Sequence, residues 1–99
     1  MDAGWVVAAG HDPVEPLRAY PDRFRLMHVK DVARSSPVNT AMTVTTTEVG
    51  SDIIDWKRVL GAAVAAGVRH FAVEQEPPYP IPEIESARRS FGYLSGLQL

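Results

Sequence analysis

The sequence predicts an α/β fold in which parallel strands are flanked by helices. Three apolar runs rich in β-forming residues occupy residues 2–8, 24–30 and 69–75, and each has the length of a buried strand. Segments with helix-capping residues alternate with these runs, so that the order is β-α-β-loop-α-β-α. Such alternation is typical of a parallel sheet with right-handed crossovers. Since 99 residues support one domain, residues 1–99 are predicted to form a single domain.

The first half of the chain predicts a strand, a helix and a second strand. Residues 2–8 contain a Trp-Val-Val triplet, which favours a strand. Asp12 and Pro13 suit the cap and the first position of a short helix over 14–20. The run 24–30 then gives the second strand.

The second half begins with a loop and ends with two helices around the third strand. Residues 31–54 form a loop by composition, with a short extended segment at 41–49, where β-branched residues are frequent. Asp55 caps the next helix, and Gly67 ends it. After the strand at 69–75 comes a proline-rich loop, and Pro82 opens the last helix, with acidic residues in its first turn.

Composition excludes several classes of function. The net charge is −2 and the basic residues are scattered, so the chain offers no basic surface for nucleic acid. No apolar run reaches the ~18 residues of a membrane span, and the N-terminus lacks the pattern of a signal peptide. The absence of cysteine fits a reducing compartment. We therefore expect a cytoplasmic protein that binds neither nucleic acid nor membranes.

Three polar residues stand at or near the ends of the predicted strands. Asp2 opens the first apolar run, His28 lies in the second, and Glu74 lies near the end of the third. Because sites in parallel α/β folds lie at the carboxyl ends of strands, these side chains can converge on one divalent metal ion. Simpler explanations are a packed core histidine at His28, a solvated carboxylate at Asp2, and a partner of a buried cation at Glu74.

The tetrapeptide HVKD adds candidates directly after the histidine. Lys30 and Asp31 either contact a substrate or form an exposed ion pair at the start of a loop. Arg34 follows, and its long side chain is placed to reach back over the same strand ends. Glu48 is either a further carboxylate near these strand ends or a turn residue.

Five motifs occur in the order expected for one known family. They are DAGWVVAAGHDP, RFRLMHVKD, TEVGSDIIDW, AAGVRHFAVEQE and RRSFGYL, and together they cover nearly the whole chain. On these motifs the chain resembles the C-terminal part of the sugar phosphate isomerase/epimerase family, the xylose-isomerase-like TIM barrels. The resemblance implies a partial (β/α) TIM-barrel-like segment, since a complete barrel needs about 250 residues. We also expect sequence to be missing upstream of Met1.

The resemblance implies metal-dependent chemistry at the three strand-end residues. Asp2, His28 and Glu74 match three of the four metal ligands of the epimerase-type members. No residue here matches the fourth, a glutamate on an earlier strand. Mn²⁺ or Mg²⁺ suits this oxygen-rich set, with Co²⁺ or Zn²⁺ as alternatives. Glu74 is then also the catalytic acid/base, which removes a proton beside a carbonyl to give an enediolate.

The resemblance also gives Lys30, Asp31 and Arg34 as residues that bind a small sugar or sugar phosphate. Trp5 stands where the epimerases usually have a histidine, which departs from the ketose 3-epimerase pattern. Two functions stay open. One is a metal-dependent sugar isomerase or epimerase that is incomplete in this chain. The other is a non-catalytic truncated barrel fragment that acts as a structural or self-associating module. In both cases we expect the isolated chain to have little or no activity.

A few strands taken from a closed barrel leave open edges and an uncovered inner face. Val6, Leu26 and Val73 are expected on that face, where water would otherwise reach them. We therefore expect a homo-oligomer. The alternative is a compact monomer in which residues 31–54 fold over the open side.

Overall fold

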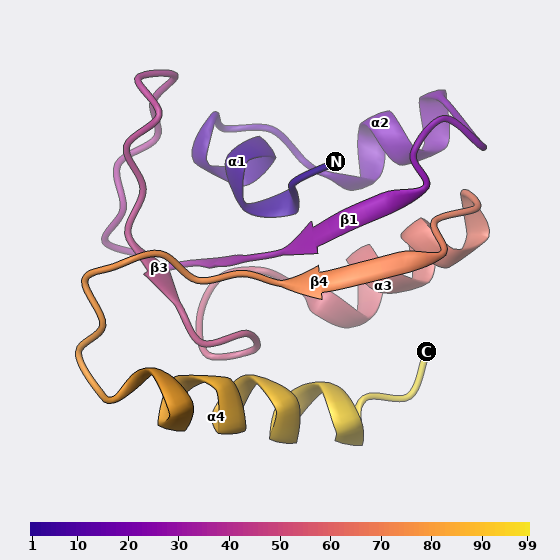
Figure 1. The fold of residues 1–99 in the computed structure, drawn as a ribbon. Helices are drawn as coiled ribbons and strands as arrows, with labels where there is room; N and C mark the ends of the chain where they lie inside the picture. The colour runs from indigo at the N-terminus through magenta and orange to yellow at the C-terminus, as the bar shows by residue number, and fades with distance from the viewer.

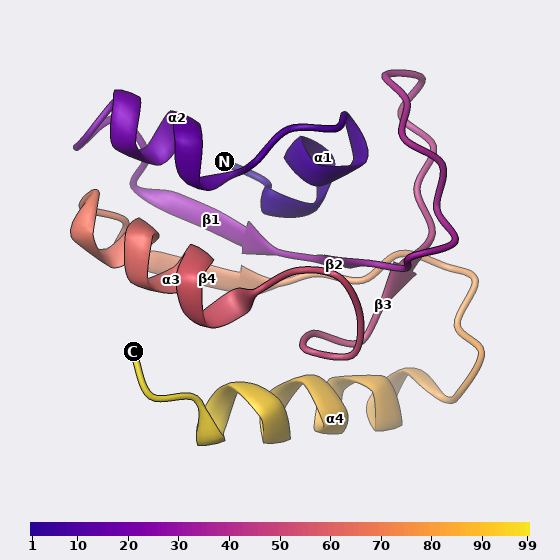
Figure 2. The same ribbon diagram turned by 180° about the vertical axis from the view of Figure 1, so that it is seen from behind.

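The computed structural model describes all residues, 1–99, and has a parallel two-stranded sheet surrounded by helices. The elements are α1 (Ala3–Ala8), α2 (Val14–Ala19), β1 (Leu26–Val29), β2 (Asp31–Val32), β3 (Thr46–Thr47), α3 (Trp56–Ala65), β4 (His70–Val73) and α4 (Glu83–Gly96). Helices α1 and α2 lie along the β1 side of the sheet, and α4 lies along the β4 side (Figure 1). The view from behind shows α3 in front of the sheet (Figure 2), and α3 packs against α2. The predicted α/β fold is confirmed.

Strand β1 is the centre of the sheet. It pairs in parallel with β4, and Leu26 lies opposite His70. On its other edge β1 forms one parallel bridge, between His28 and Asp2. The carboxyl ends of these parallel segments therefore meet at one edge, which is where the sequence predicts a site.

Residues 3–8 form helix α1, so the prediction of a strand over residues 2–8 is wrong. Only the bridge at Asp2 has strand pairing, and α1 begins at the next residue. Asp2 Oδ1 accepts a hydrogen bond from the backbone N–H of Trp5 at 3.0 Å, which caps the first turn. Gly4 allows α1 to lie against β1, because a Cβ there would come within 2.7 Å of Lys30. Capping and close packing outweigh the β preference of the Trp-Val-Val triplet.

The other helices begin near the predicted positions. Asp12 Oδ1 accepts a hydrogen bond from the backbone N–H of Val14, and Asp55 Oδ1 accepts one from that of Arg58. These carboxylates satisfy donors that have no partner within the helix. Helix α3 ends before Gly67, whose φ of +87° favours glycine. The proline-rich loop then leads into α4.

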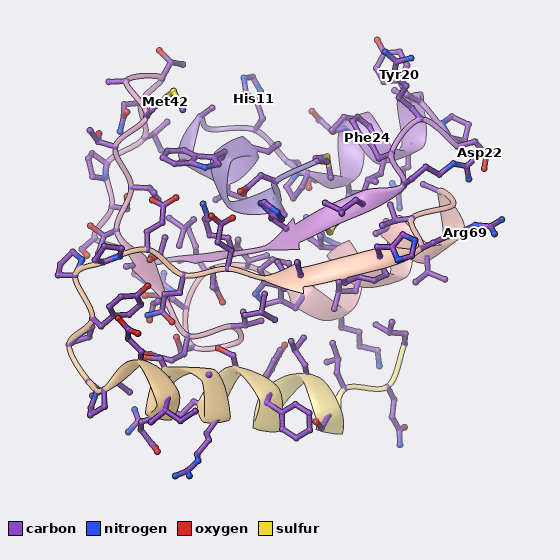
Figure 3. All side chains as sticks on the ribbon, in the orientation of Figure 1. His11, Tyr20, Asp22, Phe24, Met42 and Arg69 are labelled. Atoms are coloured by element: carbon purple, nitrogen blue, oxygen red, sulfur yellow. The ribbon has the colours of Figure 1, made fainter.

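Strands β2 and β3 form a second, antiparallel pair. The segment between them, residues 33–45, is an arm that extends away from the sheet (Figure 1). Asn39 fixes its turn with side-chain hydrogen bonds to two backbone carbonyls, and Met42 lies on the arm far from the sheet (Figure 3). The predicted extended segment at 41–49 is present in part, as β3.

The hydrophobic core lies between α2, α3 and the buried sides of β1 and β2. Its side chains are Ala3, Val14, Leu17, Met27, Val29, Val32, Val49, Ile54, Trp56, Val59, Leu60, Ala63, Ala66 and Val68. All four residues of β4 are exposed, so the core does not extend across that strand. None of the helices combines the length and apolarity needed to cross a membrane.

Candidate metal centre

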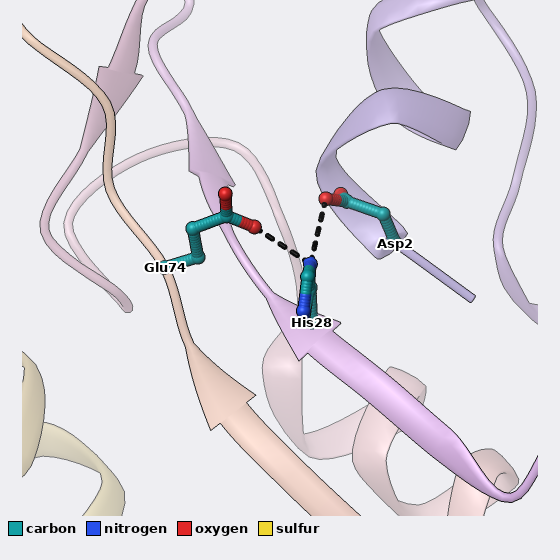
Figure 4. A group of neighbouring side chains, drawn as sticks. All are labelled: Asp2, His28 and Glu74. Atoms are coloured by element: carbon teal, nitrogen blue, oxygen red, sulfur yellow. Dashed lines mark ion pairs between the residues drawn. The ribbon is translucent and has the colours of Figure 1, made fainter.

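Asp2, His28 and Glu74 meet at the carboxyl-end edge of the sheet (Figure 4). Their nearest ligand atoms all lie within 4.8 Å of one another. His28 Nδ1 is 2.6 Å from Glu74 Oε2 and 3.4 Å from Asp2 Oδ2. The structure thus brings together the three residues that the sequence predicts as metal ligands.

Backbone pairing fixes the position of each of these side chains. Asp2 is held beside His28 by the parallel bridge. Glu74 follows β4 directly, and its backbone N–H donates to the carbonyl of Val29 at 3.1 Å. Because parallel strands end at the same edge, residues far apart in the sequence point into one volume. The half-buried side chains of His28 and Glu74 are 42% and 37% exposed, so the cluster is open to solvent on one side.

The donor atoms fit a divalent metal ion. Asp2 uses Oδ1 to cap α1 and turns Oδ2 to the cluster. Glu74 Oε2 is buried and makes no hydrogen bond, although His28 Nδ1 lies 2.6 Å away. A buried acceptor without a donor costs about 1–3 kcal/mol, and a cation bound between the three atoms would remove that cost. Two carboxylate oxygens and an imidazole nitrogen suit Mn²⁺, Mg²⁺, Co²⁺ or Zn²⁺.

Lys30 lies behind this cluster and is fully buried. Its Nζ is 2.7 Å from Glu76 Oε1, 3.3 Å from Asp2 Oδ2 and 3.4 Å from Glu74 Oε2. The ring of Trp5 lies on another side, with its centroid 4.8 Å from Nζ. Burial alone would lower the pKa of Lys30, but the hydrogen bond to Glu76 and the neighbouring carboxylate charges outweigh it and raise the pKa above its ordinary value. An exposed ion pair at this position is therefore excluded.

Glu76 is a member of the site that the sequence analysis did not identify. Its signal is the spacing Glu-x-Glu at residues 74–76, because alternate residues of an extended segment share one side. The backbone of Glu76 is anchored to β3, since the hydroxyl of Thr46 accepts from its N–H and donates to its carbonyl, at 3.0 and 2.9 Å.

Asp31 does not join the cluster. It is fully buried, and its carboxylate accepts hydrogen bonds from the backbone N–H of Val32, the backbone N–H of Gly50 and Trp56 Nε1, at 2.9, 2.8 and 2.9 Å. These contacts tie β2 to the loop before α3 and to α3 itself. The structure gives this residue a role in folding rather than a free carboxylate at the site.

Arg34 and Glu48 also lie outside the cluster. The side chain of Arg34 is 81% exposed, and its Nε is 3.6 Å from Asp52 Oδ1. Glu48 Oε1 accepts a hydrogen bond from Ser86 Oγ at 2.7 Å, and this contact lowers the pKa of Glu48. Glu48 therefore links the turn after β3 to α4. Substrate contact by Arg34 stays a prediction.

Two solved structures have a similar fold. A crystal structure of a sugar phosphate isomerase/epimerase from Parabacteroides distasonis ATCC 8503 matches with a TM-score of 0.77 and 26% identity, over 96% of this chain and 29% of that chain. A second sugar phosphate isomerase/epimerase structure from the same organism matches with a TM-score of 0.74 and 24% identity, over 97% and 30%. No family model and no curated protein matches. The chain thus spans less than a third of the length of the matched proteins, and the predicted resemblance is confirmed.

Proposed function

We propose that this chain provides a metal-binding part of the site of a sugar or sugar phosphate isomerase/epimerase. The observation that carries the proposal is the convergence of Asp2, His28 and Glu74 at the carboxyl ends of parallel strands. The similarity in fold to two sugar phosphate isomerases/epimerases supports it. The exposed side of the cluster gives a small polar molecule a way to reach the three side chains.

Asp2 Oδ2, His28 Nδ1 and Glu74 Oε2 would hold the ion. A bound divalent ion polarises a carbonyl and an adjacent hydroxyl of the sugar. The ion pairs of Glu74 use Oε2, so Oε1 could take the proton beside the carbonyl, which would convert the sugar to its enediolate. Lys30 Nζ lies 3.4 Å from Glu74 Oε2, so its positive charge would stabilise negative charge that develops on a substrate at the cluster.

A Mn²⁺ titration tests the site. Wild type is expected to bind Mn²⁺, and His28→Ala is expected to bind it at least about tenfold more weakly. Even the mutation of a residue that only supports a ligand typically lowers metal affinity about 10–100-fold. His70→Ala is the matched control, because His70 is an exposed histidine at the other end of the β1–β4 ladder. Equal binding by wild type and His28→Ala would refute the proposal.

Activity gives a second test. The 99-residue chain is expected to show little or no metal-dependent interconversion of aldoses and ketoses. Three protein ligands and one acid/base carboxylate stand in the cluster, and absence of one acid/base group costs ~10²–10⁴ in rate. Substantial turnover by the purified chain would show that a second proton-transfer group is present.

We propose self-association as a second function, favoured by exposed apolar side chains on both faces of the sheet. Leu26, Phe71 and Val73 are 48%, 41% and 49% exposed, and the outer edge of β4 has no strand beside it. The strand register places Leu26 on the face opposite to Phe71 and Val73, so the expectation that Leu26 and Val73 share one inner face is wrong. A homo-oligomer would cover both features. Sedimentation equilibrium at micromolar concentration is expected to give a mass above 10.8 kDa. A monomer mass with cooperative unfolding would contradict it.

A further inference from the structure

Lys30 and a metal ion compete for the same oxygen atoms. The Asp2 and Glu74 oxygens that face His28 Nδ1 are also the ones nearest to Lys30 Nζ, at 3.3 and 3.4 Å. Both distances exceed those of ordinary charged hydrogen bonds. The shortest contact of the ammonium, 2.7 Å, is to Glu76 Oε1. Glu76 is therefore the main partner of the ammonium.

The ammonium has no alternative position in solvent. The Lys30 side chain is fully buried, and α1 packs closely on its stem at Gly4. Trp5 closes a further side of the ammonium. If Glu76 lost its negative charge, the carboxylates nearest to the ammonium would be those of Asp2 and Glu74.

The charges of this group match a divalent ion. Asp2, Glu74 and Glu76 carry three negative charges, and Lys30 carries one positive charge, which leaves −2 when His28 is neutral. A divalent cation balances that charge. One carboxylate is thus assigned to the ammonium and two are left for the metal.

We propose that Glu76 is a positioning residue, which anchors Lys30 away from the oxygens of Asp2 and Glu74 and thereby sets the affinity of the site for a divalent ion. The inference rests on the proposed metal site. This role of Glu76 differs from a direct electrostatic attraction between Glu76 and the ion, because Glu76 acts on metal affinity through the position of Lys30. Removal of Lys30 should therefore abolish the effect of removing Glu76.

A double-mutant cycle on Mn²⁺ affinity tests this coupling. Glu76→Gln keeps a neutral acceptor oxygen but loses the negative charge that holds the ammonium, so it is expected to weaken Mn²⁺ binding about tenfold or more. Lys30→Met is expected to bind at least as tightly as wild type, and the double variant is expected to bind within about twofold of Lys30→Met, which is the usual scatter of additive effects. Glu15→Gln, an exposed glutamate on α2, is the matched control and should equal wild type.

The outcomes separate the inference from the proposed function. If wild type binds no Mn²⁺, the metal site fails and the inference fails with it. If wild type binds and Glu76→Gln binds equally well, the inference alone is overturned. An equal loss in the wild-type and Lys30→Met backgrounds would also overturn it, since Glu76 would then act directly. Circular dichroism checks that each variant folds. Glu76→Asp keeps the charge with a shorter reach and should lie between wild type and Glu76→Gln, so it replaces Glu76→Gln if that variant unfolds.

Discussion

Asp31 and Glu74 each follow one of the two parallel strands, yet their surroundings are opposite. The Asp31 carboxylate accepts three hydrogen bonds from neutral N–H donors, two on the backbone and one on Trp56. The Glu74 carboxylate accepts no hydrogen bond, and Oε2 faces an imidazole nitrogen and an ammonium. One carboxylate is fully satisfied within the chain, and the other is not.

This difference shows that a carboxylate at a strand end is not by itself a functional residue. The donors around Asp31 have fixed positions, so its charge stabilises the fold and has no capacity for a ligand. Glu74 retains an acceptor that only a cation or a substrate would satisfy. Changes at Asp31 should therefore alter stability, whereas changes at Glu74 should alter metal binding.

The largest effect is expected for Asp31→Ala. Loss of the carboxylate leaves Trp56 Nε1 and the backbone N–H of Gly50 without acceptors, and each unsatisfied donor costs about 1–3 kcal/mol. The free energy of unfolding, measured by urea denaturation, should fall by about 3 kcal/mol or more. Asp31→Asn keeps one acceptor oxygen and should lose less. A stability equal to wild type for Asp31→Ala would contradict the role assigned to this network.

The second effect concerns Mn²⁺ and Glu74. At a Mn²⁺ concentration of 100 times the dissociation constant, wild type should gain about 2.7 kcal/mol in free energy of unfolding. Glu74→Gln should gain far less at the same concentration, because one of the three ligands has lost its charge. Without metal its stability should lie within about 1 kcal/mol of wild type, as for changes that disturb no hydrogen bond.

Parallel denaturation curves with and without Mn²⁺ measure both quantities. Glu15→Gln again serves as the matched control. If metal-free Glu74→Gln were destabilised as strongly as Asp31→Ala, the contrast between the two carboxylates would not hold.

The contrast also explains which features the sequence predicts. The caps at Asp12 and Asp55 depend on donors within three residues, so local reasoning is sufficient. The convergence of His28 and Glu74 follows from strand direction, since parallel strands end together. Asp2 opens a run that was predicted as a strand, so strand direction does not place it at that end, and its membership of the cluster was implied by the family resemblance.

Other features depend on contacts that the sequence does not reveal. Helix α1 replaces a predicted strand because its cap and the close approach at Gly4 outweigh the local β preference. The hydrogen-bond donors of Asp31 at Gly50 and Trp56 lie beyond a long loop in the sequence. Neither the burial of Asp31 nor the full set of hydrogen bonds to its carboxylate was therefore predictable. The same holds for Lys30, whose exposure depends on how α1 packs.

A smaller effect is expected for Gly4→Ala, which changes the space around Lys30 and removes no polar group. The added Cβ would lie 2.7 Å from both Lys30 Cγ and the Lys30 carbonyl oxygen, so α1 or β1 must move. Overpacking of this kind costs about 1–3 kcal/mol. Because Lys30 borders the cluster, Mn²⁺ affinity should change as well. An unchanged stability would show that α1 is not held tightly against β1.

The smallest effect is expected for Gly61→Ala, on α3. No atom lies within 4 Å of a Cβ built at Gly61, and its φ is not positive, so alanine fits the helix without strain. Alanine in place of glycine within a helix should raise the free energy of unfolding by about 0.5–1 kcal/mol. Helix α3 carries Trp56, which donates to Asp31, but it contributes no side chain to the metal cluster. Urea denaturation should therefore show a gain in stability, while the Mn²⁺ affinity should equal that of wild type. A changed affinity would mean that the network around Asp31 and the cluster around Glu74 are energetically coupled, and the separation of their two roles would then be wrong.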